Sequence, residues 1–319
     1  MHKASIITLS ITLLGFIGPA FPATVFAQET VPNNVSTVSV EQRLQQFSKQ
    51  LSKEPVDARV DRVWHLIPGL AGWALIEDES MRATKEAHDG KIHLVWRQVP
   101  PKISAASLGA EPIYRAPDAE KSISLMVNVS WGEEYVPAML KILRSSHVHA
   151  TFFLDGKWVK EHPDLVKAMV QDGHAIGSHG SGHPDFRKLT NAGLERQLDG
   201  TNAIIENITH RKVTAIAPPS GSYDNRLVKM TKARKTYTIM WTADTVDWRR
   251  PPAEVIVARA KRGLTPGCLL LMHPTKSTVE ALPQIIKLIE ANGYHAKTID
   301  DVIAERPSVQ PPSVLSGVQ

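Results

Sequence analysis

Cysteine is almost absent from this sequence. The single cysteine among 319 residues, Cys268, excludes any intrachain disulfide. It lies in the apolar run CLLLM, so we expect a buried, inert thiol rather than a nucleophile. The 42% of hydrophobic residues are enough for a full core, with room for one large domain and a smaller one.

Dense basic runs and nucleotide-binding motifs are also missing. No G-x-G-x-x-G or P-loop follows any apolar run, which disfavours a nucleotide site. The lack of a Lys/Arg-rich run disfavours nucleic acid as a partner. A net charge of +5 suits a polyanionic wall or membrane surface by long-range attraction, or is scattered over an ordinary surface.

Residues 1–27 have the composition of a signal peptide. A short basic start is followed by an uncharged stretch ending in VFA, whose small residues at alternate positions fit a signal-peptidase site before Gln28. An uncleaved membrane anchor is the alternative, because the apolar run is nearly long enough to span a bilayer. Pro19 and Pro22 argue against one long helix, so we expect cleavage. In both cases the rest of the chain is predicted to be secreted or extracytoplasmic, associated with cell wall or spore.

Three segments are expected before the main domain. The polar residues 28–55 are expected to be flexible, with at most a marginal helix near 40–51. Residues 56–99 are expected to form a small α/β domain, with helices at 56–70 and 81–89 and strands at 71–78 and 91–99. The proline-rich residues 100–120 are expected to be a loop and linker.

Residues 121–305 alternate apolar runs with amphipathic stretches. Strands are expected at 123–129, 149–155, 174–179, 213–219, 237–242 and 268–274. Helices are expected at 136–146, 162–173, 191–208, 225–235, 252–262 and 279–293. This order predicts a parallel sheet covered by helices, either a barrel or a doubly wound sheet of about seven units. Residues 306–319 are Pro- and Ser-rich and predicted to be disordered.

Polar residues gather where the expected strands end. His179 and His183 in SHGSGH can converge on one zinc or cobalt ion from a loop, or can be two loop histidines with ordinary hydrogen bonds. His273 ends a strand, where it can protonate a leaving amine or simply cap the strand. Asp247 can orient His273 and Trp248 can form a pocket wall, unless both belong to a solvated turn.

Taken in order, these motifs resemble those of the NodB-type polysaccharide deacetylases, also called carbohydrate esterase family four. SHGSGH is similar to the family's metal-binding motif H-[ST]-x-x-H, DTVDW to its fourth motif, and Leu271-Met272-His273 to its fifth, L-x-H. The resemblance implies a distorted (β/α) barrel preceded by the small α/β domain. It also implies catalytic residues His273 and Asp247, metal ligands His179 and His183, and a pocket lined by Trp248, Leu271 and Pro219.

Three positions depart from the family's motifs. Ser130 and Trp131 stand where T-F-D-D-G has its two aspartates, which serve as the general base and the third metal ligand. Ala217 stands where R-x-P-[YFW] has the arginine that orients the base. A catalytic zinc usually has three protein ligands, so the divalent metal, zinc or cobalt, is predicted to bind weakly or not at all. A serine cannot take a proton from water near neutral pH without a base beside it.

Three functions remain open at this point. The first is N-deacetylation of peptidoglycan-type amino sugars by a metal-dependent hydrolase, with Glu133, Glu134 or Asp244 as a substitute ligand after a shift of backbone or rotamer. The second, slightly favoured by the residues, is a catalytically silent relative that binds cell-wall or spore polysaccharide. The third, another hydrolysis centred on His273 and Asp247, lacks an evident nucleophile. Residues 61–70 and 94–102 add a closer resemblance to sporulation-associated deacetylase-like proteins of endospore-forming bacteria.

Overall fold

The computed structural model describes residues 38–316, and the predicted signal peptide lies outside them. The N-terminal part of the described chain contains two helices and five short strands. These are α1 (Val40–Leu51), β1 (Arg59–Asp61), β2 (His65–Ile67), β3 (Gly72–Leu75), α2 (Glu77–Ala87), β4 (Ile92–His93) and β5 (Trp96–Val99). All three sheet pairings of this part are antiparallel: β1 with β2, β3 with β5, and β4 with β14 (Val314–Leu315).

A parallel sheet organises the rest of the chain, as predicted. Seven strands lie side by side in the order β10 (Tyr237–Thr238), β9 (Ala215–Ile216), β8 (Ala175–Ser178), β7 (Thr151–Leu154), β6 (Ser122–Val129), β12 (Cys268–Met272) and β11 (Ala243–Asp244). β13 (His295–Ala296) also pairs in parallel with the first residues of β6. All eight residues of β6 are buried, as expected for a central strand covered on both faces.

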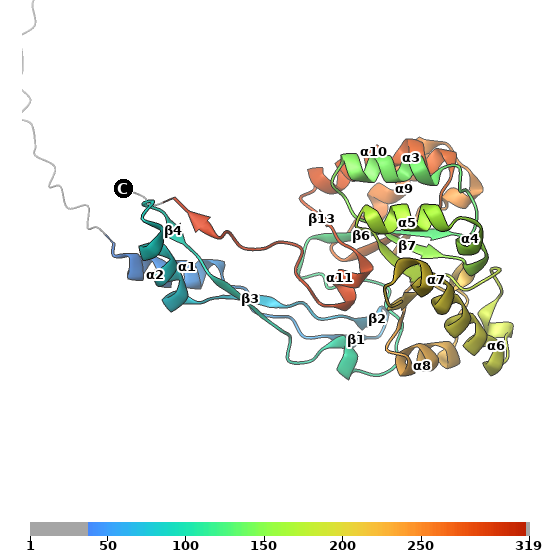
Figure 1. Ribbon diagram of the computed structural model, residues 1–319, viewed down its shortest axis with the longest axis horizontal. Coiled ribbons are helices and arrows are strands. Elements are labelled where there is room, and N and C mark those ends of the chain that lie inside the picture. The colour runs from blue at the N-terminus through green and yellow to red at the C-terminus, as the bar shows by residue number, and fades with distance from the viewer. Residues whose placement is uncertain (1–37, 317–319) are drawn as a thin grey trace, which may run out of the picture. The chain divides into compact units, whose positions relative to one another are not determined.

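Helices cover this sheet and supply its hydrophobic core. They are α3 (Val136–Ser145), α4 (Gly156–Glu161), α5 (Pro163–Gln171), α6 (Asn191–Glu195), α7 (Thr201–Thr209), α8 (Asn225–Ala233), α9 (Ala253–Gly263), α10 (Lys276–Ala291) and α11 (Ile299–Ile303). α10 packs against both α3 and α9, and these three helices lie together in Figure 1. Cys268 is buried in β12, as expected for an inert thiol. None of the described helices is both long and apolar enough to span a bilayer.

The segment 56–70, predicted to be a helix, is an antiparallel hairpin. Asp61 closes its turn, because one carboxylate oxygen accepts the backbone N–H groups of Val63 at 2.7 Å and Trp64 at 2.8 Å. Such a local side-chain bond favours a turn over a helix. The apolar residues that suggested helical spacing are partly outside the core, since Val60 and Val63 are exposed.

Two segments expected to be flexible or disordered, 28–55 and 306–319, contain regular structure. Residues 40–51 form α1, which starts at a capping box in which Ser39 and Gln42 bond each other's backbone N–H groups. Leu44 of this helix is buried with Leu75, Ile92 and Leu94. The C-terminal tail contributes β14, so neither the 28–55 segment nor the 306–319 tail is unstructured throughout. Composition indicated flexibility because both segments are polar. Their order comes from packing against residues far away in the chain, which local composition does not reveal.

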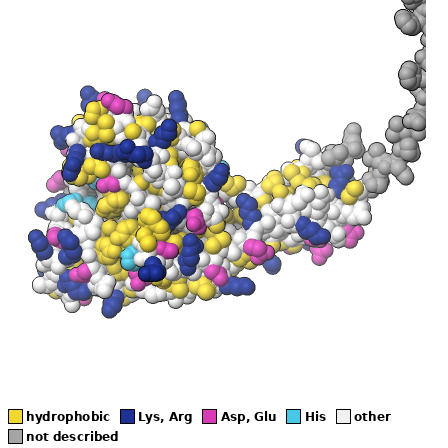
Figure 2. Space-filling view, turned by 180° about the vertical axis from the view of Figure 1, so that it is seen from behind, with side chains coloured by type: hydrophobic (Ala, Val, Ile, Leu, Met, Phe, Trp, Pro, Cys, Tyr) yellow, Lys and Arg dark blue, Asp and Glu magenta, His cyan; other side chains and the backbone are white. Residues whose placement is uncertain are grey.

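The expected linker 100–120 also packs against the sheet. Ile113 forms a parallel bridge with Ile239, and Arg115 forms an antiparallel bridge with Cys268. Ile113 and Ala116 are buried in the same core cluster as residues of β6, β9 and β12. On the face drawn in Figure 2, Lys and Arg side chains are distributed among hydrophobic and uncharged ones.

The packing of α1 predicts a measurable effect for Leu44→Ala. Removing a fully buried leucine side chain should destabilise the N-terminal region by about 2–5 kcal/mol, because a cavity remains among Leu75, Ile92 and Leu94. Hydrogen exchange of the α1 amides measures this local opening. Val40→Ala, at the exposed start of the same helix, is the matched control and should change little. Equal exchange in wild type and Leu44→Ala would show that the helix is not packed there.

Candidate functional site

The carboxyl ends of the parallel strands surround one pocket of about 340 Å³. It brings together seven of the residues singled out in the sequence: Ser130, Trp131, His179, His183, Trp248, Leu271 and His273. Four more residues line it: Asp244, one of the three proposed substitute ligands, and Asn128, Ser220 and Trp241, to which the sequence had given no role. Pro219, which the resemblance had placed in the pocket lining, is buried, and the neighbouring Ser220 lines the pocket. Parallel strands explain the convergence, because their carboxyl ends share one edge of the sheet.

His273 is held by a completely buried carboxylate. Its Nδ1–H donates to Oδ1 of Asp247 at 2.8 Å, and its backbone N–H donates to Oδ2 at 2.6 Å. The hydroxyl of Thr278 also donates to Oδ2, at 2.7 Å. Asp247 is 0% exposed, so these donors replace the water that it lost on burial. The arrangement leaves Nε2 as the ring nitrogen of His273 that can act on a ligand.

His179 and His183 lie close together. Their ring centroids are 5.3 Å apart in an edge-to-face arrangement. Nδ1–H of His179 donates to the carbonyl oxygen of Ala217 at 2.7 Å, which leaves Nε2 unprotonated. The pKa of His179 is lowered from 6.5 to about 3: burial lowers it most, the bond to Ala217 raises it, and the nearby His183 and His273 lower it. His179 is therefore a neutral imidazole at physiological pH.

Asp155 positions the loop that carries His183. Its Oδ2 accepts the backbone N–H groups of Gly182 at 2.7 Å and His183 at 3.2 Å. Its Oδ1 accepts the N–H of Lys157 at 2.8 Å and so caps α4. His183 has a positive φ of 54°, which is uncommon for a residue other than glycine. The only sequence signal for this role was an aspartate at the junction of a strand and a helix.

Trp131 lies against the ring of His273. The two rings are nearly parallel, with an interplanar angle of 4° and centroids 6.0 Å apart. The indole is 38% exposed and borders the pocket. Ser130, the preceding residue, places its hydroxyl oxygen in the pocket wall, where it is buried without a hydrogen-bond partner. The two residues thus bring an aromatic surface and a hydroxyl to the end of β6, and no carboxylate.

The residues present do not fit a three-ligand metal site. Among residues 38–316, no group of three or more His, Cys, Asp or Glu side chains is arranged to hold a metal ion. Glu133 and Glu134 line a neighbouring pocket rather than the one that contains His179. Asp244 lines the pocket that contains His179, but its carboxylate accepts the N–H of Val246 at 2.7 Å. Burial raises the pKa of Asp244, although that hydrogen bond and the nearby His273 lower it.

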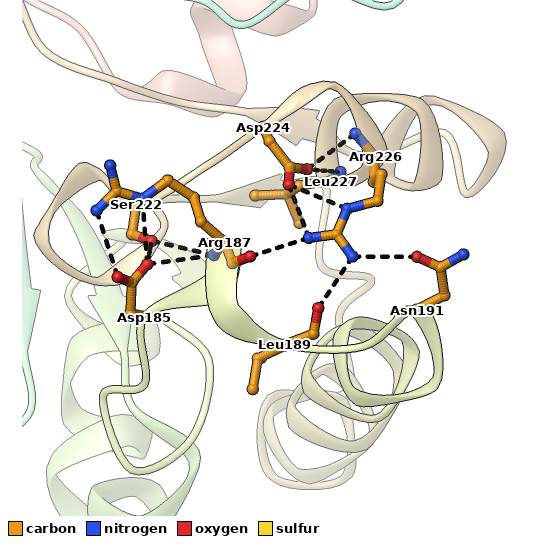
Figure 3. Close-up of polar contacts among 8 residues, drawn as sticks. All are labelled: Asp185, Arg187, Leu189, Asn191, Ser222, Asp224, Arg226 and Leu227. Atoms are coloured by element: carbon orange, nitrogen blue, oxygen red, sulfur yellow. Dashed lines mark hydrogen bonds and ion pairs between the residues drawn. The ribbon is translucent and has the colours of Figure 1, made fainter.

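A cluster of ion pairs, here called the clasp, joins two loops beside the pocket (Figure 3). Its members are Asp185, Arg187, Ser222, Asp224 and Arg226. Asp185 binds the side chains of Arg187 and Ser222, which hold the pKa of that carboxyl down at about 2. Arg226 donates to Asp224 at 2.7 Å and to the carbonyl oxygen of Arg187 at 3.1 Å.

The clasp connects the loop after His183 with the loop that contains Ser220. Arg226 also donates to the carbonyl oxygen of Leu189 at 2.9 Å, so one guanidinium spans both loops. Asp224 caps α8 by accepting the N–H of Arg226 at 2.9 Å. A planar group with five donors suits this role, and a lysine could not make all of these bonds.

Comparison with known proteins identifies the family. The family model for polysaccharide deacetylase matches residues 115–239. The protein YlxY of Bacillus subtilis is 37% identical over 281 residues, which cover 87% of this chain and 88% of YlxY. The peptidoglycan-N-acetylmuramic acid deacetylase PdaA of Bacillus subtilis is 30% identical over 201 residues, 61% of this chain and 76% of PdaA. This chain belongs to the polysaccharide deacetylase family.

Solved structures agree with this assignment. The crystal structure of a wild-type CE4 family pseudoenzyme from Bacillus anthracis matches with a TM-score of 0.75 and 37% identity, covering 84% of this chain and 95% of that one. A mutant of that pseudoenzyme, described as having restored enzymatic activity, matches with a TM-score of 0.75 and 36% identity, covering 84% and 98%. The predicted family and the distorted (β/α) barrel of about seven units are both confirmed.

The buried His179 predicts a specific response to acid. The unfolded chain takes up this proton near pH 6.5 and the folded chain only near 3, so the unfolded state binds more protons in that window. Acidification through the window therefore lowers the free energy of unfolding, and raising the pH restores it. Nuclear magnetic resonance should show the neutral Nδ1–H tautomer of His179 still present at about pH 5. Its signals can be assigned by their loss in His179→Asn, and a titration midpoint near 6.5 would contradict the prediction.

The clasp predicts a stability difference between two arginine variants. Arg226→Ala should lower the free energy of unfolding by about 1–3 kcal/mol, because several charged hydrogen bonds are lost and backbone acceptors are left unpaired. Arg226→Lys should recover less than half of that loss. Denaturant unfolding measures both. Arg59→Ala is the control: it breaks a single exposed pair with Asp118, away from the pocket, which is worth at most about 1 kcal/mol. An Arg226→Ala effect no larger than this control would argue against the clasp.

Proposed function

We propose that this protein is a catalytically silent member of its family that binds cell-wall or spore amino-sugar polymer outside the cytoplasm. The observation that carries the proposal is Trp131, an indole stacked on His273 at the end of β6, in a pocket whose described residues provide no third metal ligand. Export is supported by the N-terminal composition and the glycan by relatives that deacetylate peptidoglycan.

Half of a hydrolytic site is present. His273 and Asp247 form a pair that can protonate a leaving amine, and His179 offers a neutral nitrogen. The missing function is activation of water. Ser130 Oγ has no hydrogen-bond partner, so no general base is positioned to remove its proton. Loss of a general base typically costs about 10²–10⁴-fold in rate, before the loss of the metal is counted.

The competing function is deacetylation with a substitute metal ligand. Asp244 is the best candidate, because it lines the same pocket as the two histidines. Its raised pKa, caused mainly by burial, makes the anionic form harder to reach. Its bond to the N–H of Val246 must also be broken or shared for the carboxylate to move. These two features favour the silent protein.

One set of variants tests the proposal. The purified protein should hold less than stoichiometric zinc or cobalt and release no acetate from N-acetylglucosamine oligomers or peptidoglycan. Ser130→Asp combined with Trp131→Asp should raise metal content and start acetate release, because it supplies a base and an anionic ligand. Ser130→Asn with Trp131→Asn is the matched control, with side chains of the same size and no charge, and should stay inactive.

The opposite pattern would defeat the proposal. Stoichiometric metal and acetate release by the wild-type protein, both abolished by His179→Ala, would establish the deacetylase with a substitute ligand. Failure of wild type to bind either peptidoglycan or the oligomers would remove the glycan from the proposal.

A further inference from the structure

Trp131 lies where three pockets adjoin. Besides the pocket of about 340 Å³ already described, it lines one of about 590 Å³ together with Glu134, Arg250 and Lys276. It also lines one of about 420 Å³ together with Lys157 and Trp158. The indole of Trp131 is therefore bordered by three neighbouring pockets rather than by a single closed cavity.

The indole is exposed but held in place. His273 covers it in a parallel stack, and the ring of His273 is itself fixed by Asp247. The next residue, Gly132, has a φ of 82° and packs so closely that a Cβ there would collide with the carbonyl oxygen of Pro274. A side chain fixed in advance loses little conformational entropy when a ligand binds. Trp131 is thus suited to serve as a rigid binding surface.

A second exposed indole borders the first pocket. Trp248 is 48% exposed, and the guanidinium of Arg249 lies 4.8 Å from its ring centroid. Among the tryptophans of residues 38–316, only Trp131 and Trp248 are exposed. Exposed apolar surface beside polar groups is typical of ligand-binding grooves. Both exposed indoles lying on one pocket favour a ligand that presents apolar faces.

The pocket wall also contains polar atoms without partners. Oδ1 of Asn128 and Oγ of Ser130 are buried and form no hydrogen bond in the structure, although both residues line the first pocket. In the third pocket the same holds for Nε1 of Trp158. Such atoms are costly unless a ligand or water bonds them. Apolar C–H faces combined with hydroxyl and amide edges are the chemistry of a pyranose ring of an amino sugar.

From these observations we infer that Trp131 is a stacking platform for one pyranose ring of an amino-sugar chain, with neighbouring sugars in the two adjoining pockets. The inference rests on the proposed function and adds to it the sugar contact and the length of glycan bound. A position that resembles a metal-ligand position of the family thereby serves sugar recognition. The site takes an internal stretch of a linear chain rather than a single sugar.

Calorimetric titration of the full chain with N-acetylglucosamine dimer and tetramer, in a metal chelator, tests this inference. The tetramer should bind wild type more tightly than the dimer, because it reaches the adjoining pockets. Trp131→Ala should weaken tetramer binding about tenfold, and Trp131→Tyr, which keeps an aromatic face, about threefold. Trp96→Phe changes a tryptophan away from these pockets and should leave binding unchanged. Near-ultraviolet circular dichroism checks that each variant is folded.

The outcomes separate this inference from the proposed function. If wild type binds the oligomers and both Trp131 variants bind them equally well, the platform is overturned while the glycan-binding function stands. If the dimer and tetramer bind wild type equally, the extended site is overturned. If wild type binds neither the oligomers nor peptidoglycan, both proposals fall together.

Discussion

The buried carboxylate of Asp247 supports one whole wall of the site. A charged or polar group removed from water must have its hydrogen-bonding capacity satisfied, and Asp247 obtains this from His273 and Thr278. The same bonds fix the plane of the His273 ring. Trp131 then stacks on that plane, so the orientation of an exposed indole depends on a carboxylate with no exposed surface.

The hydrogen bonds that hold the loops around the pocket do not involve the residues at the first-motif position. The loop with His183 is held by Asp155, the loop with Ser220 by the clasp, and His273 by Asp247. None of these contacts involves Ser130 or Trp131. A protein of this fold can therefore lose its water-activating groups and keep a pocket. The residues that hold the loops are different from those that would activate water, so a binding role can persist where hydrolysis is lost.

Local patterns were reliable where one physical signal dominated. The buried strands and amphipathic helices of residues 121–305 were predicted because apolar runs and helical periodicity agree with the tertiary structure there. The local pattern was wrong at 56–70, where the Asp61 side chain closes a turn that periodicity cannot detect. Local patterns also missed β14 and indicated α1 only as a marginal helix, because the order of both comes from contacts with residues far away in the chain. Short polar segments carry no periodic signal of such contacts.

The sequence by itself determined the family, the parallel sheet and the inventory of polar residues at the strand ends, because motifs and apolar periodicity are local properties. It could not show that Asn128 and Trp241 share the pocket with His179, or that Ser220 lines the pocket while Pro219 is buried. It also could not show that Trp131 faces His273. The two residues are 142 positions apart in the chain and come together because β12 pairs with β6 in the sheet. Only the tertiary structure decides such contacts, because side-chain direction at a strand end depends on the packing of neighbouring loops.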